Sequence, residues 1–277
     1  MRMRLTAVTV LALALSAAAL RVSAITFGFV DTSNAFSNVG AFIVRSPTTG
    51  EIFPICSGTL IAPDAFLTAS HCTAFFEQDL ALRGFTAFVS FDSPIGFGDQ
   101  TSRRTRLIPV VSVVTNPAFN QAQSDSGDIG LLIVDARQTG GITPATLPSA
   151  GLLDQILASG GFATAPITNV GYGLQNRVVG GGVPFFQDAN PIPRMFSFST
   201  FNALNRGYIR YSQNPATGDG GACFGDSGGP QFFTSAGTTY IVSITITGDA
   251  VCRATNVAYR LDAEGARSFL APYVALP

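Results

Sequence analysis

Short apolar runs, separated by clusters of turn-forming residues, recur along most of the chain. In the first half these runs are rich in Val, Ile, Phe and Thr and are bounded by Gly, Pro, Asn and Asp, a composition typical of β-strands. The apolar positions there show no sustained helical period. This pattern predicts strands at 39–44, 58–61, 65–69, 85–91, 107–114 and 129–134.

Strand-like runs resume after a segment rich in Gly, Pro and Thr, residues 138–151, which we expect to cross between two halves. Residues 262–276 place Ala266, Phe269 and Leu270 at helical spacing, which predicts one terminal helix. Many short strands and one late helix favour antiparallel barrels or a sandwich. The later strands are expected at 165–172, 194–201, 208–211, 230–233 and 238–246, with a glycine-rich loop at 178–182.

The first 24 residues predict a secretory signal peptide. Arg2 and Arg4 precede an apolar run from 5 to 20, and a small residue, Ala24, stands at the expected cut. The alternative is a membrane anchor, but the run is short for a span of about 20 residues. Removing three arginines with this segment changes the net charge from −1 to −4. A mildly acidic mature protein gives no electrostatic reason to bind nucleic acid.

Four cysteines in an exported chain are expected to be paired, and four allow three connectivities. Cys56 and Cys72 bracket one short segment, and Cys223 and Cys252 bracket another, so local pairing is the simplest choice. No C-x-x-C spacing supports a zinc site, and the chain has one histidine. We therefore expect no metal.

The loop at 221–230, reading G-A-C-F-G-D-S-G-G-P, holds a hydroxyl, Ser227, among three glycines. Glycine permits backbone angles that let amide N–H groups converge on one point. A nucleophile beside convergent N–H donors is the geometry that acyl transfer needs. The alternative is an ordinary turn, because Gly, Asp, Ser and Pro are also turn residues.

His71 is the only histidine and therefore the only imidazole available as a general base near neutral pH. A lone histidine is often structural, but a serine loop elsewhere favours a Ser–His pair. Such a pair needs a carboxylate to hold the imidazole. Asp128 begins an apolar run, where an acid needs a reason to be buried. Asp125 and Asp135 are nearby rivals that spacing does not exclude.

Five stretches together carry a family resemblance: C-S-G-T-L-I-A-P-D-A-F-L-T-A-S-H-C at 56–72, D-I-G-L-L at 128–132, N-V-G-Y-G at 169–173, C-F-G-D-S-G-G-P at 223–230 and C-R-A-T-N-V-A-Y-R-L at 252–261. On these the chain resembles the secreted trypsin-like serine endopeptidases of the chymotrypsin fold, nearly throughout its mature length. The resemblance implies two six-stranded antiparallel β-barrels with the site between them and a C-terminal helix. It divides the chain into 25–140 with the histidine and aspartate and 141–277 with the serine.

By the same resemblance, Ser227 is the nucleophile, His71 the general base and then acid, and Asp128 the carboxylate that orients it. The backbone N–H groups of Gly225 and Ser227 form the oxyanion hole. Ser243 aligns with a serine that supports the buried aspartate. The disulfides implied are Cys56–Cys72 and Cys223–Cys252. No metal or organic cofactor is implied, and the expected partners of the monomer are protein or peptide substrates.

Departures from the family pattern bear on substrate choice. The position at the base of the specificity pocket is Gly221, so a basic substrate side chain finds no counter-charge there. Thr245 and Val257 align with wall positions that are often glycine, and Phe224 is a further substrate-contacting candidate. These positions predict a preference for small or medium apolar residues before the cut.

The predicted signal cut exposes Ile25 directly, in I-T-F-G. In the family a new N-terminal ammonium pairs with the aspartate before the catalytic serine, here Asp226. We therefore expect signal cleavage itself to create the activating terminus. A start at Leu20 or Val22 would imply a short propeptide or another mode of activation.

Other functions are also compatible with these residues. Residues 225–229 satisfy G-x-S-x-G, the α/β-hydrolase elbow, but that fold needs a histidine after the serine and none follows Ser227. Two alternatives stay open: a protease-like binding protein that cleaves little, and an esterase using the same triad. We expect a secreted, extracellular enzyme without a stable membrane anchor.

Overall fold

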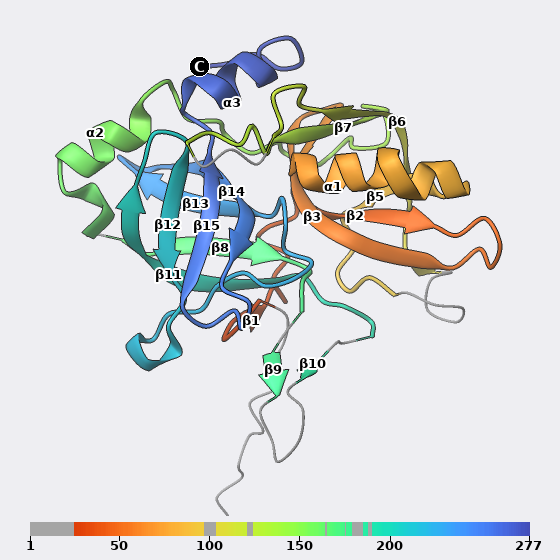
Figure 1. Cartoon of the computed structure of the whole chain (residues 1–277), viewed down its shortest axis with the longest axis horizontal. Coiled ribbons are helices and arrows are strands. Elements are labelled where there is room, and N and C mark those ends of the chain that lie inside the picture. The colour runs from red at the N-terminus through yellow and green to blue at the C-terminus, as the bar shows by residue number, and fades with distance from the viewer. Residues whose placement is uncertain are drawn as a thin grey trace, which may run out of the picture.

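The computed structural model describes residues 25–96, 104–120, 124–163, 165–174, 176–178, 185–187 and 190–277. The predicted signal segment, 1–24, lies outside these residues, as does nearly all of the loop at 178–182. Figure 1 shows two barrels side by side, with the C-terminal helix α3 (Glu264–Leu270) above them. No helix in the described part of the chain is long and apolar enough to cross a membrane.

The first barrel closes in the order β2-β3-β4-β7-β6-β5, with all neighbours antiparallel. Its strands are β2 (Val39–Arg45), β3 (Ile52–Ala62), β4 (Ala65–Thr68), β5 (Thr86–Ser90), β6 (Ile108–Thr115) and β7 (Gly130–Val134).

The second barrel closes because β8 pairs with both β13 and β11. Its strands are β8 (Ile167–Gly171), β11 (Met195–Leu204), β12 (Tyr208–Ser212), β13 (Pro230–Ser235), β14 (Thr238–Gly248) and β15 (Thr255–Arg260). The prediction of two six-stranded antiparallel barrels with a terminal helix is confirmed.

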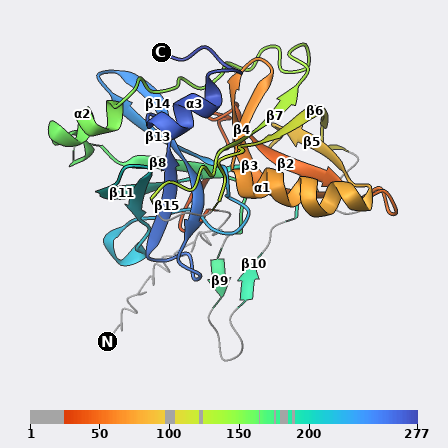
Figure 2. The same ribbon diagram turned by 45° about the horizontal axis from the view of Figure 1, so that its top comes forward.

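Two short strand pairs lie outside the barrels. β1 (Phe29–Val30) pairs with β11, so residues 29–30 lie against the second barrel although β2 to β7, which follow in the sequence, build the first. β9 (Asn176–Val178) pairs with β10 (Phe185–Gln187) in a ribbon that projects from the barrels (Figure 2).

Continuous apolar runs form strands here because both strand faces are covered. In β2, Ala41 and Ile43 enter a cluster that extends into the second barrel, whereas Phe42 and Val44 enter a cluster containing Phe76. Successive strand residues point to opposite faces, so the two sets alternate with period two. Burial on both faces explains why this strand reads as an unbroken apolar run.

Helical structure at 70–83 was not expected from the sequence. α1 (Ser70–Phe75) continues into a π-helical turn (Phe76–Leu80) and a 3₁₀ turn (Ala81–Arg83). Cys72, Phe76 and Leu80 are buried at a spacing of four residues against the first barrel. The spacing of these apolar positions is helical, but there are only three of them and a π turn interrupts the α-helical geometry.

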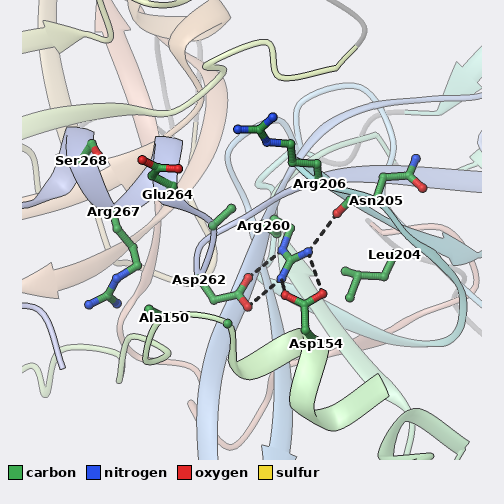
Figure 3. A pocket seen from close by; sticks show the side chains of 12 residues that line it. Ala150, Asp154, Leu204, Asn205, Arg206, Arg260, Asp262, Glu264, Arg267 and Ser268 are labelled. Carbon is green, nitrogen blue, oxygen red and sulfur yellow. Dashed lines mark hydrogen bonds and ion pairs between the residues drawn. The ribbon is translucent and has the colours of Figure 1, made fainter. Parts of the chain in front are cut away.

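The helix α2 (Leu152–Ala158) was also missed, since its stabilising partners are distant in sequence. The Asp262 carboxylate accepts the Leu153 N–H at 2.8 Å, in the first turn of α2. It also binds Arg260, which in turn binds Asp154 of α2 (Figure 3). Further 3₁₀ turns span Gly161–Ala163 and Pro215–Thr217.

The Arg260 cluster lies in a hollow of about 710 Å³ beside α2 and α3. The Arg260 side chain is 4% exposed, and its guanidinium also donates to the Asn205 carbonyl at 2.9 Å. Arg260 and Asp262 form a buried ion pair, and removing one partner of such a pair typically destabilises a fold by ~3–5 kcal/mol. The N–H groups of Arg260 donate to Asp262, Asp154 and Asn205, so the cluster joins α2 to the barrel. Arg260 therefore has no N–H group left for a ligand.

Candidate active site

His71 lies in α1, directly before the disulfide-bonded Cys72, and is held from one side by Asp128. Asp128 Oδ1 accepts the His71 backbone N–H at 2.8 Å, and Oδ2 lies 2.8 Å from His71 Nδ1. A carboxylate only accepts hydrogen bonds, so Nδ1 carries the proton and Nε2 keeps a lone pair. The ring is thus set to accept a proton at Nε2.

The loop that carries Asp128 is fixed by buried hydrogen bonds. The Asn116 side chain donates to the Gly127 carbonyl at 3.0 Å, and the Ser70 hydroxyl donates to the Ile129 carbonyl at 2.7 Å. Gly127 has a φ of +60°, in the left-handed region that favours glycine. The Asp128 side chain is 9% exposed. The Asp128 carboxylate can be buried because His71 donates a hydrogen bond to each of its two oxygens.

The rival aspartates have other partners. Asp125 Oδ1 accepts the Gly127 N–H at 3.1 Å and the Tyr259 hydroxyl at 2.6 Å. Asp135 pairs with Arg137 on the surface, where hydrogen bonds from that side chain hold the Asp135 pKa below its usual value. Neither carboxylate contacts His71, so of the three candidates only Asp128 orients the imidazole.

Among residues 225–229 of the serine loop, two amides have no hydrogen-bond partner within the described part of the chain. The Asp226 N–H donates to Cys223, the Gly228 N–H to Thr245 and the Gly229 N–H to Asp226. Within the described residues, the N–H groups of Gly225 and Ser227 donate to no protein atom. These two flank Asp226 and are available to a ligand oxygen, as an oxyanion hole requires.

Glycine is required in this loop by conformation and by space. Gly225 has a φ of +93° and Gly228 a φ of +77°. A Cβ on Gly228 would lie 2.6 Å from the Ser57 carbonyl oxygen, inside van der Waals contact. Any other residue would push the loop away from the first barrel, which carries His71.

His71 and Ser227 line one pocket of about 260 Å³ at the junction of the barrels. His71 comes from the first barrel and Ser227 from the second. Both predicted disulfides are present: Cys56–Cys72 lies beside His71, and Cys223–Cys252 lies in the pocket wall. The pocket therefore combines the Ser227 hydroxyl and the oriented His71 imidazole with two backbone N–H groups that have no acceptor among the described residues.

The pocket walls differ from the alignment made on sequence. Thr245 and Phe224 line the pocket, whereas Val257 and Gly221 are absent from its lining. Gly221 is instead joined to Thr26 by two backbone hydrogen bonds of 2.9 and 3.1 Å. The wall residues that sequence reasoning missed are Ala222, Ile246, Thr247, Gly248, Asp249 and Asn256.

Ser243 does not contact Asp128. Its hydroxyl donates to Gln231 Oε1 at 2.9 Å and shares a 2.7 Å hydrogen bond with the Tyr211 hydroxyl, inside the second barrel. Backbone hydrogen bonds of 2.8 and 2.9 Å join Thr245 to Gly228 and Gly229, so the β14 residues that reach the pocket begin at Thr245, two residues after Ser243. This register is set by pairing between distant strands and has no local sequence signal.

Asp249 puts one carboxylate in the pocket wall. Burial alone would raise its pKa, but the backbone N–H groups of Thr255, Arg253 and Ala254 outweigh this and lower it. The Gln213 side chain donates to the same carboxylate at 3.1 Å. Four donors from its own surroundings thus keep Asp249 ionised without a cation.

Asp226 is buried beneath the serine loop without a cationic partner among the described residues. Its oxygens accept the N–H groups of Gly173 and Cys223 at 2.8 and 2.9 Å. Burial nevertheless raises its pKa to about 7. The segment that starts at Ile25 lies close to this loop, since Thr26 pairs with Gly221 and the Ile25 side chain is buried.

This combination of two closed barrels, an Asp–His pair and a glycine-lined serine loop defines a serine hydrolase of the two-barrel type. A family profile described as Trypsin matches residues 28–263. The chain therefore belongs to the trypsin family, the serine proteases of the chymotrypsin fold.

Proposed function

We propose that the protein is an active serine endopeptidase that works through Ser227, His71 and Asp128. The observation that carries the proposal is the paired contact of Asp128 with the backbone and ring of His71, in the pocket that Ser227 also lines. His71 Nε2 removes the Ser227 proton as the hydroxyl attacks the scissile carbonyl. The Gly225 and Ser227 amides hold the oxyanion, and an acyl-enzyme forms and is then hydrolysed.

The two alternative functions are separated by one comparison. Purified protein should cleave a fluorescent casein and should turn over matched peptide amide and ester substrates. A protease-like binding protein would turn over neither substrate. An esterase would turn over the ester alone. Amide cleavage that fails while the ester reacts would therefore contradict the endopeptidase.

We expect small or medium apolar residues before the cleaved bond. Within the pocket the Cys223–Cys252 disulfide and Ile246 give apolar surface, and the Asp249 carboxylate already accepts hydrogen bonds from its own surroundings. A basic side chain would enter without a dedicated partner, which is costly when it is buried.

A panel of peptide amides that differ only in this residue measures the preference. We predict that Ala, Val or Leu exceeds Arg and Lys in kcat/KM by at least about tenfold, the scale on which such pockets discriminate. Dominant cleavage after Arg or Lys would contradict the prediction. Asp249→Asn would then show whether that carboxylate is responsible.

We further propose that the mature chain starts at Ile25 after export and that its ammonium pairs with Asp226. The Thr26–Gly221 bridge already brings this segment to the loop. Ile25 has a φ of +59°, unfavourable for a β-branched residue, and cutting the bond before it removes that restriction. Terminal sequencing of the secreted protein should read I-T-F-G; a start at Leu20 or Val22 would contradict the proposal.

The same pairing predicts a change in the pH dependence of stability. Because burial raises the Asp226 pKa to about 7, an N-terminally extended chain should lose stability as pH rises from about 4 to 7, where burial opposes ionisation. A free Ile25 ammonium would favour the ionised form and remove this loss. Urea unfolding of the two forms at several pH values measures it. Equal pH dependence in both would contradict the pairing.

A further inference from the structure

Ser57 is a fully buried residue of the first barrel whose polar groups reach into the serine loop of the second. Its hydroxyl donates to the Gly225 carbonyl at 3.0 Å. Its backbone N–H donates to the Ser227 carbonyl at 2.9 Å. One residue of β3 thus holds both residues whose amides are free to meet an oxyanion.

The Ser57 hydroxyl is itself fixed in direction. It accepts the Tyr172 N–H at 3.0 Å, so its own proton is directed to Gly225. The Ser57 carbonyl accepts the Thr68 hydroxyl at 2.9 Å, which ties this part of β3 to β4. The contacts with Gly225 and Tyr172 fix the direction of the hydroxyl, which spans the junction of the barrels.

The contact with Gly225 acts on its N–H through the conformation at the Gly225 Cα, because that N–H belongs to the preceding peptide unit, whose Phe224 carbonyl accepts the Leu174 N–H at 2.7 Å. The Gly225 carbonyl and the Asp226 N–H belong to one peptide unit, and the Asp226 N–H is held by Cys223 at 3.0 Å. Ser57 therefore fixes the other end of that unit. Without it, a glycine at φ +93° has no side chain to keep its peptide planes in place.

We propose that Ser57 is a positioning residue for the oxyanion hole, holding the Gly225 peptide through its hydroxyl while its amide holds Ser227. We call this the Ser57 bridge; it rests on the proposed function of the site. Ser57 does not touch substrate. It acts through Gly225, so its loss should weaken binding of the transition state more than binding of the substrate.

Ser57→Ala removes the hydroxyl and leaves the backbone N–H bond to Ser227. We expect kcat to fall about tenfold with KM nearly unchanged, less than the ~10²–10³-fold loss when an oxyanion donor itself is removed. Binding of a peptide trifluoromethyl ketone, whose hemiketal oxygen occupies the oxyanion hole, should weaken by the same factor. Binding of the matching product peptide should not change.

Thr59→Val is the matched control. Thr59 lies on the same strand and is buried, but its hydroxyl has no hydrogen-bond partner within the described residues. Its kcat and ketone affinity should equal those of the unmodified protein. Ser57→Gly, which also lacks the hydroxyl, replaces Ser57→Ala should the latter fold poorly by circular dichroism.

The possible results distinguish failure of the Ser57 bridge from failure of the proposed endopeptidase function. An unmodified protein that cleaves no amide contradicts the proposed function. An active unmodified protein with Ser57→Ala unchanged in kcat and ketone affinity overturns the bridge alone. A lower melting temperature with unchanged kinetics also overturns it, since that result assigns Ser57 to stability only.

Discussion

Replacing Ser227 by alanine should lower kcat by about 10⁶-fold, the scale of loss when the nucleophile of a serine protease is removed. The loss is this large because Ser227 forms the covalent intermediate. Among the described residues, the other hydroxyls that line the pocket are those of Thr245 and Thr247. Catalysis of ~10³–10⁴-fold over water should persist from the oxyanion hole and substrate binding. Single-turnover and steady-state assays with a peptide amide measure both.

Two controls make the Ser227→Ala result specific. Ser235→Ala changes a serine at the end of β13, outside the pocket, and should leave kcat unchanged. The melting temperature of Ser227→Ala should match the unmodified protein, because the substitution removes only a hydroxyl that lines the pocket. Activity that survives Ser227→Ala within about tenfold would show that another group attacks.

Asp128→Asn should lower kcat by about 10⁴-fold at neutral pH, the effect this substitution has in serine proteases of this kind. Asp128 accepts the His71 backbone N–H on Oδ1 and the ring Nδ1–H on Oδ2, and an amide has an oxygen at only one of these two positions. If its NH₂ group faces the ring, Nδ1 becomes the acceptor and Nε2 carries the proton. The imidazole then has no lone pair for Ser227.

Asp125→Asn is the matched control for Asp128→Asn. Its Oδ1 contacts, Gly127 N–H and the Tyr259 hydroxyl, can both be made by an amide oxygen. We expect kcat to change by less than about tenfold, the size of one lost neutral hydrogen bond. If Asp125→Asn were as damaging as Asp128→Asn, the roles of the two carboxylates would have to be reassigned.

The barrels could be predicted from sequence because the signal for a strand is local. Runs such as 39–44 and 129–134 are short, β-branched and bounded by turn residues, and they fall on β2 and β7. α2 could not be found in this way, because the carboxylate that accepts an N–H group of its first turn belongs to Asp262, more than a hundred residues later. Its seven residues carry too short a period to decide between helix and strand.

The chemical residues of the site were predictable for a different reason. A single histidine, a glycine-rich serine loop and an acid at the start of an apolar run each have an ordinary structural explanation alone, but together they predicted a Ser–His–Asp site. Spacing alone left Asp125 open beside Asp128, and the family resemblance selected Asp128. In the structure Asp128 contacts His71, whereas Asp125 contacts Tyr259.

The pocket walls could not be placed from sequence, because the pairing of Thr245 with Gly228 and Gly229 decides which residues of β14 reach the pocket. Ser57 was not singled out for a related reason. Its hydrogen bonds to Gly225 and Tyr172 span more than a hundred residues and exist only when the two barrels meet.

The central claim, that Ser227 is a nucleophile activated by His71, is tested most directly by covalent labelling. Folded protein that starts at Ile25 is treated with a fluorophosphonate, digested and mapped by mass spectrometry. The account predicts one adduct, on Ser227, formed far more slowly in Asp128→Asn and absent in Ser227→Ala. An adduct on another residue, or none on folded protein with this terminus, would contradict it.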